Sequence, residues 1–147
     1  MKDRMDTSYS ISDNGDMYTL DKKDKIKDLG VTFDYRLTFH DHIQEKVNRA
    51  YSMLGLTKKN FIHMDSNTFI LLYNSLIRPH LDYASTACCP YKIGDIEVIE
   101  KIQKRATKLV ICLKKLPYTE HLKELDLHTL KYRRIRGDMI EIFKIIQ

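Results

Sequence analysis

Residues 95–113 read DIEVIEKIQKRATKLVICL, and this stretch indicates the kind of fold that the chain can form. Apolar residues recur along it at every third or fourth position, which is the period of an α-helix with one buried face. That face consists of Ile96, Ile99, Ile102, Ala106, Leu109, Val110 and Leu113. Asp95 stands where it can cap the start of the helix, and Pro117 breaks it. The stretch therefore predicts a long amphipathic helix in the core of a helical domain.

The same period continues through most of the chain after Phe39. It predicts further helices over residues 41–55, 65–79, 80–87 and 119–125, and a last helix from residue 129 onward. Asp41 is expected to cap the start of the first of these, and Gly55 and Pro79 are expected to end the first two. The last helix is expected to turn an apolar stripe inward, formed by Tyr132, Ile135, Met139, Ile142, Phe143 and Ile146. No Gly, Asn or Pro follows that stripe, so we expect the chain to be cut inside this element.

Before Phe39 the pattern changes to short β-forming stretches separated by turn residues. Asp13-Asn14-Gly15-Asp16 is typical of a hairpin turn, and Gly30-Val31-Thr32-Phe33 is the best strand in the chain. Gly30 inside that strand indicates a bulge or the close approach of another backbone. The predicted fold is mainly α, with a small antiparallel β element at the N-terminus. We expect a disordered arm over residues 1–8, β-hairpin structure over 9–39 and a helical domain over 40–147.

Composition and motifs exclude several classes of protein. With 43% hydrophobic and 31% charged residues the chain is not typical of disorder, and its longest apolar run, residues 69–73, is far too short to span a membrane. Three cysteines without a paired spacing indicate reduced thiols in an intracellular protein of the nucleus or cytoplasm. The sequence has no Gly-rich phosphate loop, HExxH or GxSxG, and His40-Asp41-His42 fits neither a zinc nor an iron site. We therefore expect no catalytic residue, no metal and no cofactor.

The positive charge is concentrated in one part of the chain. The net charge is +5, yet residues 101–136 alone hold 11 Lys and Arg against 3 Asp and Glu, a balance of +8. Two helical stripes carry much of it, one formed by Lys101, Lys104, Arg105 and Lys108 and the other by Lys131, Arg133, Arg134 and Arg136. A single stripe of this kind is also common on an ordinary solvated helix face. Two stripes so close together favour contacts with nucleic-acid phosphates that do not read sequence.

An ordered series of short motifs resembles the reverse transcriptases of jockey-like non-LTR retrotransposons, in the part that follows the catalytic motif. The series covers about residues 9–147, and no single motif in it is specific. It begins with Asp28-Leu29-Gly30-Val31-Thr32-Phe33-Asp34, continues through residues 75–85 (SLIRPHLDYAS) and 100–109 (EKIQKRATKL), and ends with residues 132–138 (YRRIRGD). Cys88-Cys89-Pro90 departs from the family, which usually has a Trp-Asn-Pro-like step there.

This resemblance implies a role for each part of the chain. Leu29 and Gly30 would belong to the primer-grip hairpin, a remnant of the polymerase palm, and residues 40–147 would form a truncated thumb that follows the template–primer duplex. The family's palm carries a Tyr-x-Asp-Asp motif and an upstream Asp, and no Tyr-x-Asp-Asp stretch is present here. The implied function is thus a fragment of an RNA-directed DNA polymerase that binds an RNA/DNA duplex or DNA backbone, without membrane contact. On its own it would be inactive, because it lacks the catalytic aspartates and the palm and fingers that carry them.

Two alternatives remain open at the level of sequence. The first alternative to a polymerase fragment is an independent small helical module that binds nucleic acid or protein. The second is an inert retroelement remnant. A sharp two-state melt would favour the independent module over a severed thumb, and detection of the polypeptide in cells would exclude the inert remnant.

Overall fold

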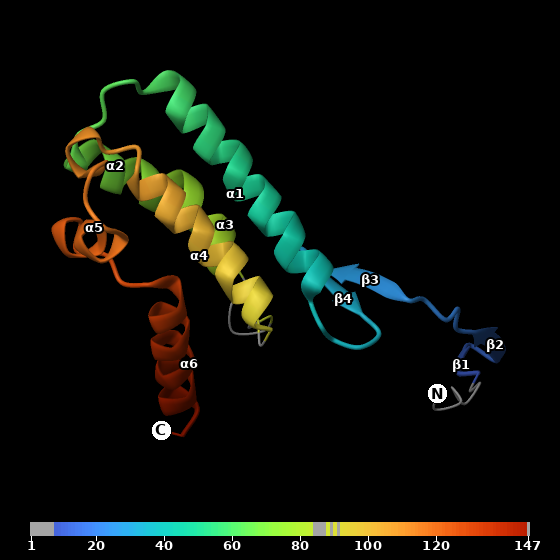
Figure 1. The fold of residues 1–147 in the computed structure, drawn as a ribbon. Coiled ribbons are helices and arrows are strands. Elements are labelled where there is room, and N and C mark those ends of the chain that lie inside the picture. Colours follow the sequence, from blue (N-terminus) through green and yellow to red (C-terminus); the bar gives the residue numbers. More distant parts are fainter. Residues whose placement is uncertain (1–7, 84–87, 89, 91, 147) are drawn as a thin grey trace.

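The computed structural model describes residues 8–83, 88, 90 and 92–146. These residues form a mainly helical structure with two small antiparallel β-hairpins at the N-terminus, which confirms the predicted fold class (Figure 1). Of the predicted arm over residues 1–8, all but Ser8 lies outside the described residues, and so do residues 84–87 of the short helix predicted to begin at His80. None of the described helices is both long enough and apolar enough to cross a lipid bilayer.

Each hairpin consists of two four-residue strands joined by a two-residue turn. The strands are β1 (Ser10–Asp13), β2 (Asp16–Thr19), β3 (Lys25–Asp28) and β4 (Val31–Asp34), and β1 pairs with β2 and β3 with β4. Both residues of each turn have positive φ: 50° and 95° at Asn14 and Gly15, and 44° and 75° at Leu29 and Gly30. Such turns match the twist of the strands they join. Gly30 therefore lies in the turn before β4, and the prediction that it lies inside a strand is wrong.

Six α-helices follow in the described part of the chain, and they bury the core between them. They are α1 (His40–Asn60), α2 (Ser66–Leu72), α3 (Arg78–Asp82), α4 (Ile93–Thr107), α5 (Tyr118–Glu124) and α6 (Leu130–Ile146). In Figure 1, α1 and α4 lie side by side and run in the same direction, so that their C-terminal ends are neighbours. The core lies between these two helices and the α2–α3 segment; its most buried residues include Val47, Ala50, Phe69, Tyr73, Ile77, Ile102, Ala106 and Val110.

The start of α1 is fixed from outside the helix. The carboxylate of Asp34, at the end of β4, accepts hydrogen bonds from the backbone N–H groups of Arg36, Thr38 and Phe39 at 2.9–3.1 Å. These bonds hold the chain in the tight turn that precedes the helix, and they lower the pKa of Asp34, with the Thr38 N–H as the largest cause. Asp41, the cap expected from the sequence, instead pairs with Lys25 at 2.5 Å. The carboxylate that organises this helix start therefore comes from the preceding strand.

Neither Gly55 nor Pro79 ends its helix, contrary to the prediction. Gly55 lies inside α1, which continues to Asn60. Pro79 lies in the first turn of α3, where its missing N–H does no harm, because the first N–H groups of a helix have no partner within it. Between α2 and α3 the chain passes through a wider π-helical turn (η1, Tyr73–Ile77). The chain is thus helical from residue 66 to residue 82.

The long helix predicted from Asp95 starts slightly earlier and ends sooner. Asp95 lies in the first turn of α4 and is buried, where its carboxylate contacts His40 Nδ1 at 2.8 Å. The α-helix ends at Thr107, and a 3₁₀ turn (η2, Ile111–Leu113) follows. The buried side chain of His121 closes this end, because its Nε2 lies 2.6 Å from the Leu113 carbonyl oxygen and its Nδ1 lies 3.0 Å from the Thr107 hydroxyl. Two bonds to one imidazole hold the bend in place.

The apolar stripe of α6 does not face inward, which corrects the prediction. Tyr132, Ile135, Met139, Ile142, Phe143 and Ile146 are all more than half exposed. Within the described chain, α6 buries only Leu130 and Arg134, both near its start. Figure 1 shows α6 leaving the other helices after this point. The helical period reveals that a helix has an apolar face, but it does not show that the same chain supplies a neighbour for it.

Candidate nucleic-acid interface

A groove lies where the C-terminal ends of α1 and α4 meet. Its volume is about 760 Å³. The last turns of α1, the loop after them, the last turn of α4 and the segment after α4 form its walls. The groove is lined by Tyr51, Leu54, Gly55, Lys58, Phe61, Ile62, His63, Arg105, Lys108, Leu109, Ile111 and Lys114.

The groove is strongly positive. Lys58, Arg105, Lys108 and Lys114 contribute four formal positive charges, and none of the described residues that line it is Asp or Glu. Cations are common at helix C-termini, because each terminus carries roughly half a negative charge. Two termini therefore account for roughly one of the four charges, and roughly three remain without compensation from the helix ends. A surplus of this size attracts a polyanion.

Aromatic rings lie beside these cations. The guanidinium of Arg105 sits over the ring of Tyr51, with 5.2 Å between the guanidinium carbon and the ring centroid. This contact orients Arg105 without neutralising it, since the ring carries no net charge. Phe61, just beyond the end of α1, is 41% exposed and also lines the groove. Cations with exposed aromatic rings are the combination that proteins use to hold a nucleic-acid backbone together with unpaired bases.

The structure places the first predicted stripe on solvent-facing positions. Lys101, Lys104, Arg105 and Lys108 are all exposed. Arg105 and Lys108 line the groove, whereas Lys101 and Lys104 lie outside its lining, on the exposed face of α4. Lys108 directly follows the last residue of the helix. The stripe thus leads along α4 towards the groove.

The second predicted stripe, on α6, is divided between surface and interior. Lys131 and Arg136 are exposed, as the prediction requires. Arg133 forms an ion pair with Asp82, at 3.3 Å between Nη2 and Oδ2. Arg134 is only 7% exposed and lies in a pocket near the start of α1 rather than on the outer surface. The structure thus differs from the prediction of four outward cations on this helix, because Arg133 and Arg134 lie on the side of α6 that faces the other helices.

The predicted primer-grip pair forms the tip of the β3–β4 hairpin. The side chain of Leu29 is 86% exposed, and its carbonyl oxygen accepts a hydrogen bond of 2.6 Å from the hydroxyl of Tyr83. A Cβ at Gly30 would lie 2.9 Å from the same hydroxyl oxygen. The close approach that Gly30 suggested is therefore real, but the group that approaches is a side chain and not a backbone. Tyr83, directly after α3, ties the hairpin to the helices.

Sequence reasoning did not identify Lys58, Phe61 and Lys114 as residues of the site. Lys58 belongs to a Lys-Lys pair in the last turn of α1, and Lys114 to another pair after η2. Each pair is visible in the sequence as a local charge. That both flank the end of α4 depends on the parallel packing of α1 and α4, which the sequence pattern does not reveal.

Within the part of the chain that the structure describes, no group of three or more His, Cys, Asp or Glu side chains could hold a metal ion. Comparisons with family models, with curated proteins and with solved structures find no match for the chain. The case for a function therefore depends on the groove and on the residues around it.

Proposed function

We propose that this chain binds the phosphate backbone of nucleic acid through the groove between the ends of α1 and α4, without reading sequence. The observation that carries the proposal is the set of four cations with no carboxylate among the described residues that line the groove. Backbone contacts of this kind position a protein on nucleic acid but carry no sequence information. Lys101, Lys104, Lys131 and Arg136, all exposed, would add weaker contacts from outside the groove.

We further propose that the chain is the primer-grip and thumb part of a retroelement reverse transcriptase of the jockey-like kind. The proposal depends on the ordered motifs described above, and the groove supports it because a thumb must hold a duplex by its backbone. In this reading the chain acts inside the cell, in the nucleus or cytoplasm, and contributes no catalytic aspartates of its own. The palm and fingers of the parent polymerase would supply those.

Salt dependence of binding tests the groove directly. Each phosphate neutralised on duplex DNA changes the slope of log K against log salt by about −0.9. Four contacts give a slope of about −3.6, so affinity for a duplex should fall about 150-fold between 50 and 200 mM salt. The measurement is a fluorescence anisotropy titration of labelled duplexes of unrelated sequence. A slope near zero, or strong preference for one sequence, would contradict the proposal.

Charge reversal locates the contacts. The double variant Arg105→Glu with Lys108→Glu removes two of the four groove cations. The slope of log K against log salt should then be reduced to about −1.8 for every nucleic-acid sequence. The double variant Lys22→Glu with Lys23→Glu is the matched control, because it changes the net charge by the same −4 at two exposed residues between β2 and β3. In Figure 1 the segment between β2 and β3 lies far from the C-terminal ends of α1 and α4. Equal losses in the groove variant and in the control would indicate an effect of net charge alone. No binding by the unmodified chain would favour the alternative of a protein-interaction module.

A further inference from the structure

The groove between the ends of α1 and α4 holds exposed apolar side chains as well as cations. Phe61, Ile62 and Ile111, which all line it, are 41%, 78% and 44% exposed. Contact with a phosphate backbone does not require such side chains, because phosphates are bound by cations and other hydrogen-bond donors. Exposed apolar side chains that gather in one hollow mark the place of a ligand with an apolar surface of its own. The groove is therefore built to bind more than a row of phosphates.

The loop that carries Phe61 is fixed at both ends. The backbone N–H of Phe61 donates a hydrogen bond of 3.0 Å to the Thr57 carbonyl oxygen in α1. Three residues after Phe61 the side chain of Met64 is buried, and the Asp65 carboxylate then accepts a hydrogen bond from the backbone N–H of Thr68 and caps α2. The backbone at Phe61 is thus in place before a ligand arrives, which reduces the entropy lost on binding.

Arg105 brings a second planar group to the groove. Its guanidinium sits over the ring of Tyr51, with 5.2 Å between the guanidinium carbon and the ring centroid. Nucleobases stack on guanidinium planes as well as on aromatic rings. Arg105 is exposed and lines the groove, so a ligand in the groove can reach a guanidinium that Tyr51 already orients. The groove thus combines two planar groups, those of Phe61 and Arg105, with the charges of three lysines.

A nucleic acid with unpaired bases matches both kinds of group. In a duplex the bases are stacked inside, and a protein must flip a base out before it can reach its face. A single strand offers base faces and phosphates together, and proteins bind it with a positively charged groove and aromatic side chains. The residues that line the groove all belong to the described chain, and none of them is Asp or Glu.

We propose that the groove takes a single strand of nucleic acid, with unpaired bases stacked on Phe61 and Arg105 and the phosphates along the neighbouring lysines. The volume of about 760 Å³ lies within the range of roughly 300–1,000 Å³ that is usual for small-molecule sites, so a nucleotide fits with its base. This inference rests on the proposed function, because the same cations bind the backbone. It adds that the preferred ligand is a single strand rather than a duplex.

Salt dependence separates the two ligands. Four phosphate contacts give a slope of log K against log salt of about −2.8 for a single strand and about −3.6 for a duplex. The ratio of single-strand to duplex affinity should therefore rise about threefold between 50 and 200 mM salt. Fluorescence anisotropy measures it with a labelled strand of about 15 thymidines, which forms no hairpin, and a blunt duplex of equal length.

At 200 mM salt the thymidine strand should bind at least about fivefold more tightly than the duplex, the effect of one stacked base. Equal or tighter binding of the duplex at this salt concentration would overturn the inference and leave the proposed function intact. Binding of neither ligand would refute both.

Replacement of Phe61 locates the stacked base. Phe61→Ala should weaken binding of the thymidine strand about 5- to 150-fold. The salt slope and the affinity for the blunt duplex should stay unchanged, because no cation is removed, and the duplex therefore also reports that the variant is folded. Phe61→Tyr keeps a ring and should retain the affinity. Phe143→Ala is the matched control, since Phe143 is an exposed phenylalanine on α6 outside the groove lining. Unchanged binding of the thymidine strand by Phe61→Ala would refute the inference.

An abasic strand completes the test, because it has the phosphates of the thymidine strand without the bases. The unmodified protein should bind it at least about fivefold more weakly than the thymidine strand, with the same salt slope. Phe61→Ala should not weaken binding of the abasic strand further. Equal affinity for the abasic and thymidine strands would overturn the inference, since phosphates alone would then account for binding. A loss in Phe61→Ala that persists with the abasic strand would overturn it as well.

Discussion

Glu100 is expected to hold α5 and α6 on the helical core, and removing its side chain tests this. Its Oε1 accepts a hydrogen bond of 2.5 Å from the Tyr118 hydroxyl in α5, and its Oε2 accepts one of 3.0 Å from the backbone N–H of Leu130 at the start of α6. Burial, followed by the hydrogen bond to Glu100, raises the pKa of Tyr118 above its usual range. One carboxylate on α4 therefore connects three helices.

The cost of Glu100→Ala follows from these two bonds. A hydrogen bond to a charged group is worth about 1.5–3 kcal/mol, and both donors lose their partner in the variant. Because Glu100 is only half-buried, water can replace part of the loss, and we expect the free energy of unfolding to fall by about 2–4 kcal/mol. Urea denaturation followed by circular dichroism measures it. Glu97→Ala is the matched control, since Glu97 is exposed and lies one turn earlier on the same helix; we expect a change within about 0.5 kcal/mol.

A double-mutant cycle sharpens this test. Tyr118→Phe removes one of the two donors to Glu100. The Tyr118→Phe variant should therefore already show part of the loss of unfolding free energy that Glu100→Ala causes. The coupling free energy between the two changes should be about 1 kcal/mol or more, because residues that share a hydrogen bond are not additive. Strict additivity, or a Glu100→Ala variant no less stable than Glu97→Ala, would refute this account of how α5 and α6 are attached.

Three further outcomes are expected. Gly30→Ala should lower the free energy of unfolding by about 1–2 kcal/mol, because φ is +75° and the new Cβ would lie 2.9 Å from the Tyr83 hydroxyl oxygen; Tyr83→Phe should relieve part of this loss in a thermal melt. Ile142→Lys on the exposed face of α6 should change stability by less than about 0.5 kcal/mol in urea, whereas Leu130→Ala should cost about 2–5 kcal/mol. Burial lowers the pKa of His42, so the unfolded chain binds more protons than the folded one just below pH 6.5. Stability in a buffer without phosphate should therefore fall as pH falls from about 6.5 towards the lowered pKa of His42, and His42→Gln should flatten this part of the profile.

Helical periodicity predicted the helices well because the core faces of α1 and α4 are continuous. Ile43, Val47 and Ala50 on α1, with Ile102 and Ala106 on α4, are all buried as their spacing requires. Helix ends were less predictable, since they depend on residues distant in sequence. A strand carboxylate organises the start of α1, and a histidine from α5 closes the end of α4. Local capping rules consider only the nearest residues.

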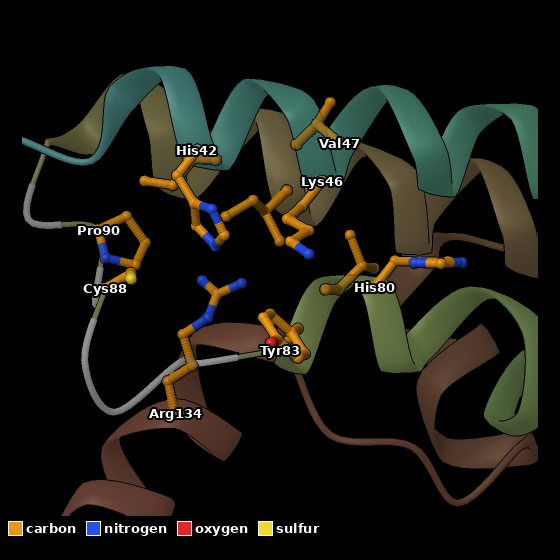
Figure 2. Close-up of a pocket in the computed structure, with 11 residues that line it drawn as sticks. His42, Lys46, Val47, His80, Tyr83, Cys88, Pro90 and Arg134 are labelled. Carbon is orange, nitrogen blue, oxygen red and sulfur yellow. The ribbon is translucent and has the colours of Figure 1, made fainter. Parts of the chain in front are cut away.

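The candidate sites were predictable only in part. Lys101, Lys104, Arg105 and Lys108 are exposed as their spacing indicates, because the opposite face of α4 is buried. The groove also needs Lys58 and Lys114, which reach it through the packing of two helices. The pocket near the start of α1 (Figure 2) could not be predicted at all, because it joins α1, α3 and α6 across more than ninety positions of sequence.

The fate of the cations shows why charge spacing alone does not define an interface. Arg105 on α4 and Arg134 on α6 belong to stripes of similar spacing, and the spacing predicts the same outward position for both. Arg105 faces a groove open to solvent because α4 packs on α1 through its other face, whereas Arg134 is buried because α6 packs through the face that carries it. An open groove can follow a polymer backbone, whereas a buried guanidinium is out of reach of one. The neighbours of each helix, rather than its own sequence, thus determine which of its arginines a polyanion can reach.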